Sequence, residues 1–208
     1  MEKTVTSKAT LGRLPRYLQL LKELPAESFP HISAAAIARR LNLGEVQVRK
    51  DLGSVCGGGR PRIGYVREEL IRSLEESLGC DRMTSAVLVG AGKLGRALLE
   101  YDEFERYGVR IAAAFDSGES PIRLNNAIEI LPMRDFESFC RSRRIQIGII
   151  TVGSGSAQAV CDQMVRSGIT AIWNFAPCGL KTPPDVLLRQ ENLALSLAHL
   201  NNQLCSMT

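Results

Sequence analysis

A glycine-spaced motif and a distant aspartate are the clearest predictors of chemistry in this 208-residue chain. The motif follows the apolar run SAVLV and reads Gly90-Ala91-Gly92-Lys93-Leu94-Gly95, which is GxGxxG. Asp116 lies twenty-one residues beyond Gly95, at the end of VRIAAAFD. Between a strand and a helix, such glycines allow a tight turn, close approach of the backbone to a pyrophosphate, and close packing. The acid accepts hydrogen bonds from ribose hydroxyls and disfavours a 2′-phosphate, so the pattern predicts NAD(H) rather than NADP(H).

Two other interpretations of this motif remain open at the level of sequence. The glycine turn can serve packing alone, or the domain can hold coenzyme A. The expected helix N-terminus supplies free N–H groups and a positive dipole end, which suit any of these phosphates.

The two histidines argue against an enzyme. His31 falls in a loop of the basic N-terminal part and His199 in the last helix, so neither is expected where a doubly wound sheet places its chemistry. Hydride transfer usually needs a general acid or base beside the nicotinamide, and the second half offers neither a Tyr-x-x-x-Lys pair nor a suitable histidine. We therefore predict a binding protein, with a small NAD-dependent oxidoreductase as the alternative.

Alternating strands and helices must position the motif. SAVLVG, VRIAAAFD, IQIGIITV and TAIWNF are strand-like, and they alternate with the helical segments RALLEYDEFERYG and SGSAQAVCDQMVRSG. This alternation predicts a parallel α/β sheet over residues 81–208. The last helix, NLALSLAHLNNQL, carries a stripe of leucines that predicts a packing partner.

The first eighty residues predict a helical domain with a hairpin. Leu14, Leu18 and Leu21 share one helical stripe, and Ser33 is a suitable N-cap for SAAAIARRL. The turn 42–44 joins that helix to EVQVRKDLGSV, which gives helix-turn-helix spacing. GGGRPRIGYV suits a β-wing, and REELIRSLEESLG closes the domain as a helix that stops at Gly79.

The charge and the side-chain types of this domain predict that it binds nucleic acid. Residues 1–66 carry a net charge of +6, from eleven Lys and Arg against five Asp and Glu, whereas residues 81–208 are neutral. In the second helix of the pair, Val48, Leu52 and Val55 share an inward face, and Val46 is expected to point outward. The predicted DNA contacts are Arg13, Arg16, Gln47, Arg49, Lys50, Arg60 and Arg62.

The six cysteines are scattered without a CxxC pair or a Cys/His cluster. This spacing predicts neither a metal site nor a disulfide framework, and it leaves a thiol sensor as the minor alternative to buried apolar cysteines. No apolar run approaches the length of a membrane helix, and the N-terminus does not resemble a signal peptide, so a cytoplasmic protein is expected.

These segments together resemble the Rex family of bacterial redox-sensing repressors over nearly the whole chain. The resemblance rests on ATLGRLPRYL, VQVRKDL, GAGKLGRALLEY, AAFD, and above all NFAP at 174–177 followed by the leucine-rich helix. It implies a homodimer whose subunits exchange their terminal helices. It further implies that the protein binds a palindromic operator and releases this DNA when NADH binds. It also implies that NADH and NAD+ compete for one site, whose nicotinamide pocket and redox-responsive tyrosine involve Thr151, Val152, Asn174, Phe175, Ala176 and Tyr101.

The resemblance completes the predicted architecture. We expect an α/β protein with a winged helix-turn-helix domain over residues 1–80 and a Rossmann NAD(H)-binding and dimerisation domain over residues 81–208. Lys93 and Gly153 depart from the residues usual in the family. The main departure is Asn192, where the family has an Asp that pairs with an arginine in one redox state. Two alternatives to a redox sensor remain: the small oxidoreductase, and a coenzyme A-binding assembly subunit whose basic N-terminal domain binds another protein.

Overall fold

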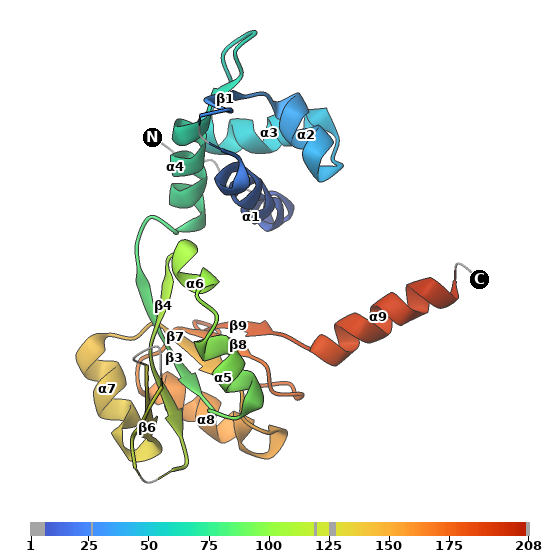
Figure 1. Cartoon of the computed structure of the whole chain (residues 1–208). Helices are drawn as coiled ribbons and strands as arrows, with labels where there is room; N and C mark the ends of the chain where they lie inside the picture. Colours follow the sequence, from blue (N-terminus) through green and yellow to red (C-terminus); the bar gives the residue numbers. More distant parts are fainter. Residues whose placement is uncertain (1–6, 26, 119, 125–127, 207–208) are drawn as a thin grey trace. The chain divides into compact units, whose positions relative to one another are not determined.

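The computed structural model describes residues 7–25, 27–118, 120–124 and 128–206. The chain divides into two compact units, Met1–Arg82 and Met83–Thr208. Within the described residues, the first unit is helical with a two-stranded sheet, and the second is built on a seven-stranded sheet (Figure 1). The predicted α/β class, with a helical N-terminal domain before a Rossmann-type sheet, is confirmed.

The first unit is held together by the predicted apolar stripe. Leu14, Leu18 and Leu21 are fully buried on α1, and the Ser33 hydroxyl accepts a hydrogen bond from the Ala36 N–H at the start of α2. α1 packs against α4, and α2 against α3. The helices of this unit are α1 (Lys8–Glu23), α2 (Ala34–Leu41), α3 (Glu45–Cys56) and α4 (Arg67–Leu78).

The helix-turn-helix and the wing form as predicted. Asn42 ends α2 in the left-handed conformation, and Gly44 begins α3. Arg60 and Gly64 exchange backbone hydrogen bonds of 2.8 and 2.9 Å, which closes the hairpin between α3 and α4. The hairpin leads into β2 (Tyr65–Val66), which pairs antiparallel with β1 (His31–Ile32), a short strand that the sequence did not predict.

The second unit has the strand order β5-β6-β4-β3-β7-β8-β9. Every pair is parallel except β5–β6, which lies at the edge. This order places the central strand β3 between β4 and β7, so the chain crosses to the other side of the sheet there. The strands are β3 (Thr84–Val89), β4 (Val109–Asp116), β5 (Ile122–Arg123), β6 (Glu129–Pro132), β7 (Ile147–Ile150), β8 (Ala171–Asn174) and β9 (Leu187–Gln190).

Side chains of β3 alternate between two cores. Val87 and Val89 face a core shared with Phe136 of α7 and Cys161 of α8, whereas Leu88 faces another that includes Leu99 of α5. Helices therefore cover both faces of the sheet, as a parallel sheet requires. The helices are α5 (Lys93–Leu99), α6 (Glu103–Arg106), α7 (Phe136–Arg143), which follows the 3-10 turn Met133–Asp135, and α8 (Ser154–Arg166).

One predicted helix is wrong in extent. The segment RALLEYDEFERYG was expected to be continuous, but α5 ends at Leu99 and α6 begins at Glu103. The break accompanies edge-to-face packing of Phe104 against Tyr101 at 5.0 Å and against Trp173 at 5.8 Å between ring centroids. These tertiary contacts override the helical periodicity of the segment.

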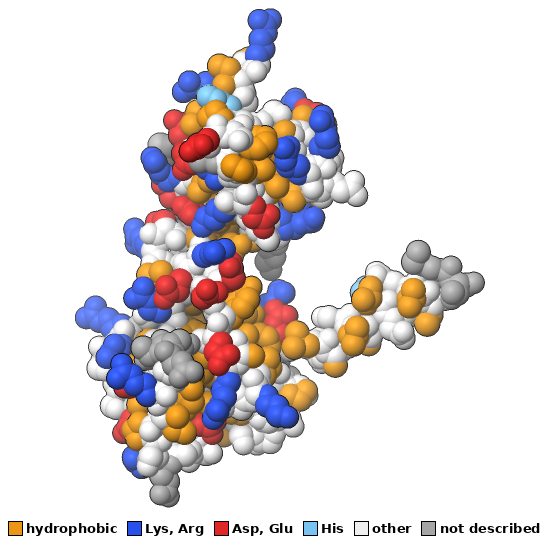
Figure 2. Space-filling model, in the orientation of Figure 1, with side chains coloured by type: hydrophobic (Ala, Val, Ile, Leu, Met, Phe, Trp, Pro, Cys, Tyr) orange, Lys and Arg blue, Asp and Glu red, His pale blue; other side chains and the backbone are white. Residues whose placement is uncertain are grey.

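The C-terminal helix α9 (Leu193–Cys205) is exposed along its entire length. It follows β9 and leads away from the sheet, and hydrophobic side chains are visible along it (Figures 1 and 2). Leu193, Leu197, Leu200 and Leu204 are each more than 60% exposed. The partner that the leucine stripe predicts is therefore not another part of the same described chain.

Candidate dinucleotide and DNA sites

The carboxyl ends of three neighbouring strands meet at the predicted dinucleotide site. Val89 is in register with Phe115 of β4 and with Ile150 of β7. The next residues along the chain, Gly90, Asp116 and Thr151, therefore lie at one edge of the sheet. This edge is at the point where the strand order reverses, which is where open α/β sheets bind ligands.

Gly90 and Gly95 are required by packing. Gly90 has φ +107°, and a Cβ on it would lie 2.8 Å from the backbone nitrogen of Val152. A Cβ on Gly95 would lie 2.0 Å from the carbonyl oxygen of Gly90. The Thr151 hydroxyl donates to that same carbonyl oxygen, at 2.7 Å, and so ties the glycine turn to β7.

Gly92 differs from both, because a Cβ on it would meet no protein atom within 4 Å and its φ of −71° suits any L-residue. It caps α5 without a side-chain hydrogen bond and lines a cleft of about 560 Å³, a size within the range of cofactor sites. Internal packing does not explain this glycine, whereas close approach of a pyrophosphate does.

Asp116 is tied to the glycine turn. Its Oδ2 accepts a hydrogen bond from the Ala91 N–H at 2.6 Å, and its Oδ1 accepts from the Ser117 N–H at 2.6 Å. The carboxylate is half-buried and lines the same cleft as Gly92. A fixed negative charge beside the turn suits ribose hydroxyls and opposes a phosphate on the same ribose.

The cleft brings together only some of the predicted cofactor contacts. Gly90, Gly92, Asp116, Thr151 and Val152 line it, whereas Ala91, Lys93, Leu94 and Gly95 belong to the adjoining turn and helix. Sequence reasoning missed further lining residues because they come from separate elements and carry no motif. These are Val89, Ser117, Met133, Ser156, Ala159, Val160 and Gln163, whereas Gly153, which also lines the cleft, was singled out from the sequence.

Tyr101 was placed wrongly by the sequence analysis, because it follows the end of α5 rather than lying on that helix. Its ring is 53% exposed and lines a different cleft, together with Phe104 and Arg143. The structure does not bring Tyr101 to the cleft that contains Gly92 and Asp116. Its contact with a cofactor remains a prediction.

The Asn174 side chain is buried and bonded to its own loop and to β9. Its amide nitrogen donates to the carbonyl oxygen of Cys178 at 3.1 Å and to Oε1 of Gln190 at 2.5 Å, and its Oδ1 accepts from the Ala176 N–H at 3.0 Å. Phe175 packs on Trp173 with 4.5 Å between ring centroids. The NFAP segment at 174–177 is thus internally braced, and Asn174, Phe175 and Ala176 do not line the cleft of Gly92.

The second helix of the helix-turn-helix, α3, presents the expected outward face. Val48 and Leu52 are fully buried, Val55 is half-buried, and Arg49 and Lys50 are exposed. Val46 is 81% exposed. Arg49 forms an ion pair with Glu45 one turn earlier on α3. Cationic side chains therefore stand on the surface that this motif turns to the major groove.

Asp51 is a buried acid on α3 that the sequence analysis missed. Its carboxylate accepts hydrogen bonds from the Arg13 guanidinium at 2.7 and 2.8 Å, the Tyr17 hydroxyl at 2.7 Å, the Gln47 amide at 3.0 Å and the Thr10 hydroxyl at 3.1 Å. Burial raises the pKa of Asp51, but these bonds outweigh it and lower the pKa to about 2. The position of Asp51 between Val48 and Leu52 on the inward face was the available signal.

This network involves two of the predicted DNA contacts. Arg13 was expected to bind a DNA phosphate, yet two of its nitrogens are bound to Asp51, and that hydrogen bond raises the pKa of Arg13. Gln47 was predicted as a DNA contact on the flank of α3; its side chain is exposed, its amide nitrogen donates to Asp51, and its DNA contact remains a prediction. Arg16 remains exposed and donates to the Leu41 carbonyl oxygen at 3.3 Å, at the end of α2.

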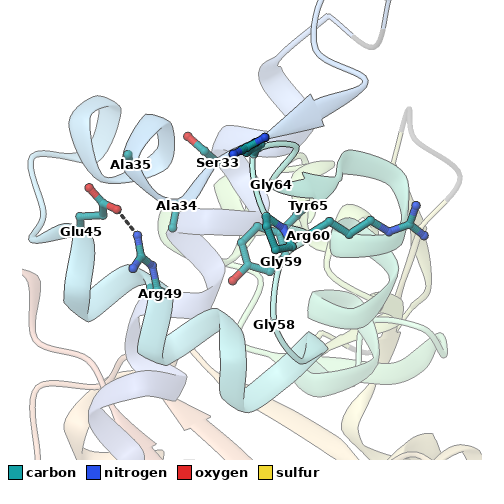
Figure 3. Close-up of a pocket in the computed structure, with 12 residues that line it drawn as sticks. Ser33, Ala34, Ala35, Glu45, Arg49, Gly58, Gly59, Arg60, Gly64 and Tyr65 are labelled. Atoms are coloured by element: carbon teal, nitrogen blue, oxygen red, sulfur yellow. Dashed lines mark hydrogen bonds and ion pairs between the residues drawn. The ribbon is translucent and has the colours of Figure 1, made fainter.

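A cleft of about 500 Å³ separates α3 from the wing. Figure 3 shows Arg49 and Glu45 on one side and Gly59 and Tyr65 on the other, with the Arg60 side chain extending away from Arg49. Arg60 and Arg62 are both exposed on the hairpin. The positions of these arginines suit contacts with phosphates or an adjacent groove.

Asn192 is the N-cap of α9, where its Oδ1 accepts a hydrogen bond from the Leu195 N–H at 2.9 Å. An amide and a carboxylate both perform this capping role. Compared with the Asp that the resemblance leads us to expect here, Asn192 keeps the cap and lacks the charge.

Comparisons with known proteins decide the family. A family model described as putative DNA-binding protein N-terminus matches residues 6–53, and one described as CoA binding domain matches residues 81–178. The redox-sensing transcriptional repressor Rex of Thermoanaerobacter sp. (strain X514) is 36% identical over 94% of this chain and 88% of its own length. The protein of the same name from Bacteroides thetaiotaomicron is 37% identical over 97% of this chain and 92% of its own. The chain belongs to the Rex family.

Solved Rex-family structures are similar to this chain over 98% of its length. The crystal structure of RSP in complex with beta-NAD+ and operator DNA covers 98% of this chain and 94% of its own, with a TM-score of 0.89 and 35% identity. The structure of RSP in complex with beta-NADH gives a TM-score of 0.83 at the same identity. Membership in the Rex family confirms the predicted resemblance and the prediction of a repressor rather than an enzyme.

The described residues bear on membrane insertion and on metal binding. No helix among them is long and apolar enough to cross a membrane, and no group of three or more His, Cys, Asp or Glu side chains there is arranged for a metal ion.

Burial raises the pKa of Cys140 to about 12 and that of Cys56 to about 11, which disfavours their reactive thiolate forms.

Proposed function

We propose that this Rex-family protein represses transcription by binding a palindromic operator and releases it when NADH replaces NAD+. The observation that carries the proposal is the cleft at the strand crossover, where Gly92 is explained by a pyrophosphate and Asp116 by a ribose. RSP, a Rex-family repressor, has been solved with beta-NAD+ and operator DNA and with beta-NADH. Residues 1–80 are the proposed DNA-binding domain and residues 81–208 the cofactor and dimerisation domain of a cytoplasmic regulator.

The proposed switch is a shift between two arrangements of a homodimer. NADH and NAD+ differ in ring charge and shape, so they can stabilise different angles between subunits. Two recognition helices must stand about 34–36 Å apart to enter one face of DNA. Each ligand shifts the equilibrium only by its difference in affinity for the two arrangements.

The exposed leucines of α9 support the homodimer. Four leucines at helical spacing, each more than 60% exposed, form a stripe that a second copy can cover. Replacing Leu197 and Leu200 by Lys is expected to give monomers in analytical ultracentrifugation, whereas Ser196→Lys and Asn202→Lys, at other exposed positions of α9, should leave the dimer intact.

The test of the function is DNA binding at fixed salt, with separate titrations of NADH and NAD+. Duplexes selected by the protein from a random pool supply the probe. Release by NADH alone supports the proposal, and indifference to both dinucleotides contradicts the switch. Because phosphate contacts make affinity fall steeply as salt rises, affinity that is independent of salt would contradict DNA binding through the basic residues.

Coenzyme A is a second candidate ligand, because the family model that matches residues 81–178 is described by its binding. The adenosine of coenzyme A carries a 3′-phosphate, which the Asp116 carboxylate opposes at the position proposed for the ribose. We therefore expect coenzyme A to bind more weakly than NADH in a direct competition. Displacement of NADH by equimolar coenzyme A would reverse this preference.

A further inference from the structure

The hydrogen bond between Gln47 and Asp51 fixes which end of the Gln47 amide faces outward. Asp51 is 1% exposed, and its lowered pKa keeps it ionised near neutral pH, so it can only accept hydrogen bonds. The Gln47 Nε2 must therefore face Asp51, as the 3.0 Å contact shows, and the carbonyl oxygen Oε1 is directed to the other side.

Several bonds hold the acceptor of that contact in place. The Asp51 carboxylate also binds Arg13, Tyr17 and Thr10, all on α1, so it cannot rotate freely to follow Gln47. Gln47 is an exposed side chain attached to a rigid, buried anchor. A side chain restrained in this way loses less conformational freedom when it binds.

Gln47 also lies where base contacts are made. It is the third residue of α3, beside Val46, and the first residues of a recognition helix contact base edges. The neighbouring Arg49 and Lys50 are donors only, and the Glu45 carboxylate is already paired with Arg49. The Gln47 Oε1 is an uncharged acceptor on this part of α3, whereas the Glu45 carboxylate is negatively charged and pairs with Arg49.

We infer that Gln47, positioned by Asp51, determines operator specificity by accepting a hydrogen bond from the exocyclic amino group of one base in the major groove. That group is N6 of adenine or N4 of cytosine, since both are donors at the groove edge. Asp51 acts as a positioning residue and does not touch DNA. The inference rests on the proposed function, because it requires operator binding.

The first experiment locates the base and removes only its amino group. Duplexes are selected from a random pool by the full-length protein and by Gln47→Met, and the position whose preference is lost in the variant is identified. At that position, nebularine replaces adenine, or 2-pyrimidinone replaces cytosine. We expect the wild-type protein to lose about tenfold or more in affinity, and Gln47→Met to lose little.

A second variant tests the role of Asp51 while leaving Asp51 itself and its partners on α1 unchanged in the sequence. Gln47→Glu keeps an acceptor oxygen but cannot donate to Asp51, and two facing carboxylates repel each other. We expect the affinity ratio between the unmodified and amino-lacking duplexes to fall to that of Gln47→Met. The ratio cancels any uniform loss of DNA affinity that the added charge causes.

The outcomes separate this inference from the proposed function. A selected motif that Gln47→Met leaves unchanged, or an amino group whose removal costs both proteins equally, overturns the role of Gln47 while operator binding stands. A Gln47→Glu protein with the wild-type ratio overturns the positioning role of Asp51. Failure of the wild-type protein to select any duplex overturns the proposed function, and the inference with it.

Discussion

The Tyr17 hydroxyl donates a 2.7 Å hydrogen bond to Oδ2 of Asp51, and both side chains are at most 1% exposed. Tyr17 lies on α1 and Asp51 on α3, so this bond crosses the interior of the DNA-binding unit. Burial and the hydrogen bond with Asp51 raise the pKa of Tyr17 to about 12, so the hydroxyl remains a donor at any physiological pH. The recognition helix is thereby attached to α1 by polar as well as apolar contacts.

Tyr17→Phe is expected to lower the free energy of unfolding of this unit by about 2 kcal/mol, because it removes a buried hydrogen bond to a charged acceptor. Helix loss followed by circular dichroism in urea measures the effect, since Trp173, the single tryptophan, reports only on the other unit. Tyr101→Phe removes the same atom from an exposed ring and should change stability little. Equal effects of the two substitutions would contradict a structural role for the Tyr17 hydroxyl.

Acid should weaken the first unit through Asp51. The folded pKa, about 2, lies below the ordinary value of 3.8, so this stabilisation is present above about pH 4 and is lost as the pH falls toward 2. The contribution is about 2 kcal/mol. Tyr17→Phe removes one bond to the ionised form and so raises the folded pKa of Asp51 toward 3.8, which should make the acid-dependent loss smaller and complete at a higher pH. Identical acid unfolding transitions of the wild-type protein and Tyr17→Phe would contradict a contribution of the Tyr17 hydroxyl to the lowered pKa of Asp51.

Gly92 and Gly95 should respond differently to substitution. Gly92 lines the cleft and a Cβ on it would meet no protein atom within 4 Å, so we expect Gly92→Val to bind NADH at least tenfold more weakly with little change in the thermal midpoint. Gly95→Ala forces a Cβ toward the Gly90 carbonyl oxygen, so it should lower the midpoint itself. NADH fluorescence and thermal circular dichroism measure the two effects, and normal NADH affinity in Gly92→Val would remove the main support for the site.

Asp116 should set the choice between NADH and NADPH. Its carboxylate stands beside the glycine turn, so the wild-type protein is expected to bind NADH at least tenfold more tightly than NADPH. Asp116→Asn keeps an oxygen for the Ala91 N–H and removes the charge, which should narrow this ratio. Asp185→Asn, at an exposed loop position, is the matched control for charge and should leave the ratio as it is.

Asn192→Asp is expected to sharpen the redox response. The carboxylate still caps α9 at Leu195 and restores the charge that other members of the family are expected to pair with an arginine. The ratio of DNA affinities with NAD+ and with NADH should therefore increase, as measured by paired titrations on one duplex. Asn192→Ser retains a cap without charge and should not increase the ratio, and an unchanged ratio in Asn192→Asp would show that the charge is not part of the switch.

The sequence by itself determined the features that depend on local spacing. Short-range patterns predict the strand, glycine turn and helix around 84–99 and the acid at the end of β4. They also predict the Ser33 cap and the inward face of α3. The charge contrast between the halves of the chain is likewise independent of folding. These features were sufficient to indicate the family and the two kinds of ligand.

Only the tertiary structure decided where side chains from separate elements meet. The buried Asp51 carboxylate accepts hydrogen bonds from Arg13 and Tyr17 of α1, which are 38 and 34 residues away in the sequence. Tyr101 lies outside the predicted helix, at a break where Phe104 packs on Trp173 of β8 on one face of the sheet. Asn174 turned inward to brace its own loop. Such contacts join residues distant in the chain, and a helical or strand period carries no information about which of them come together.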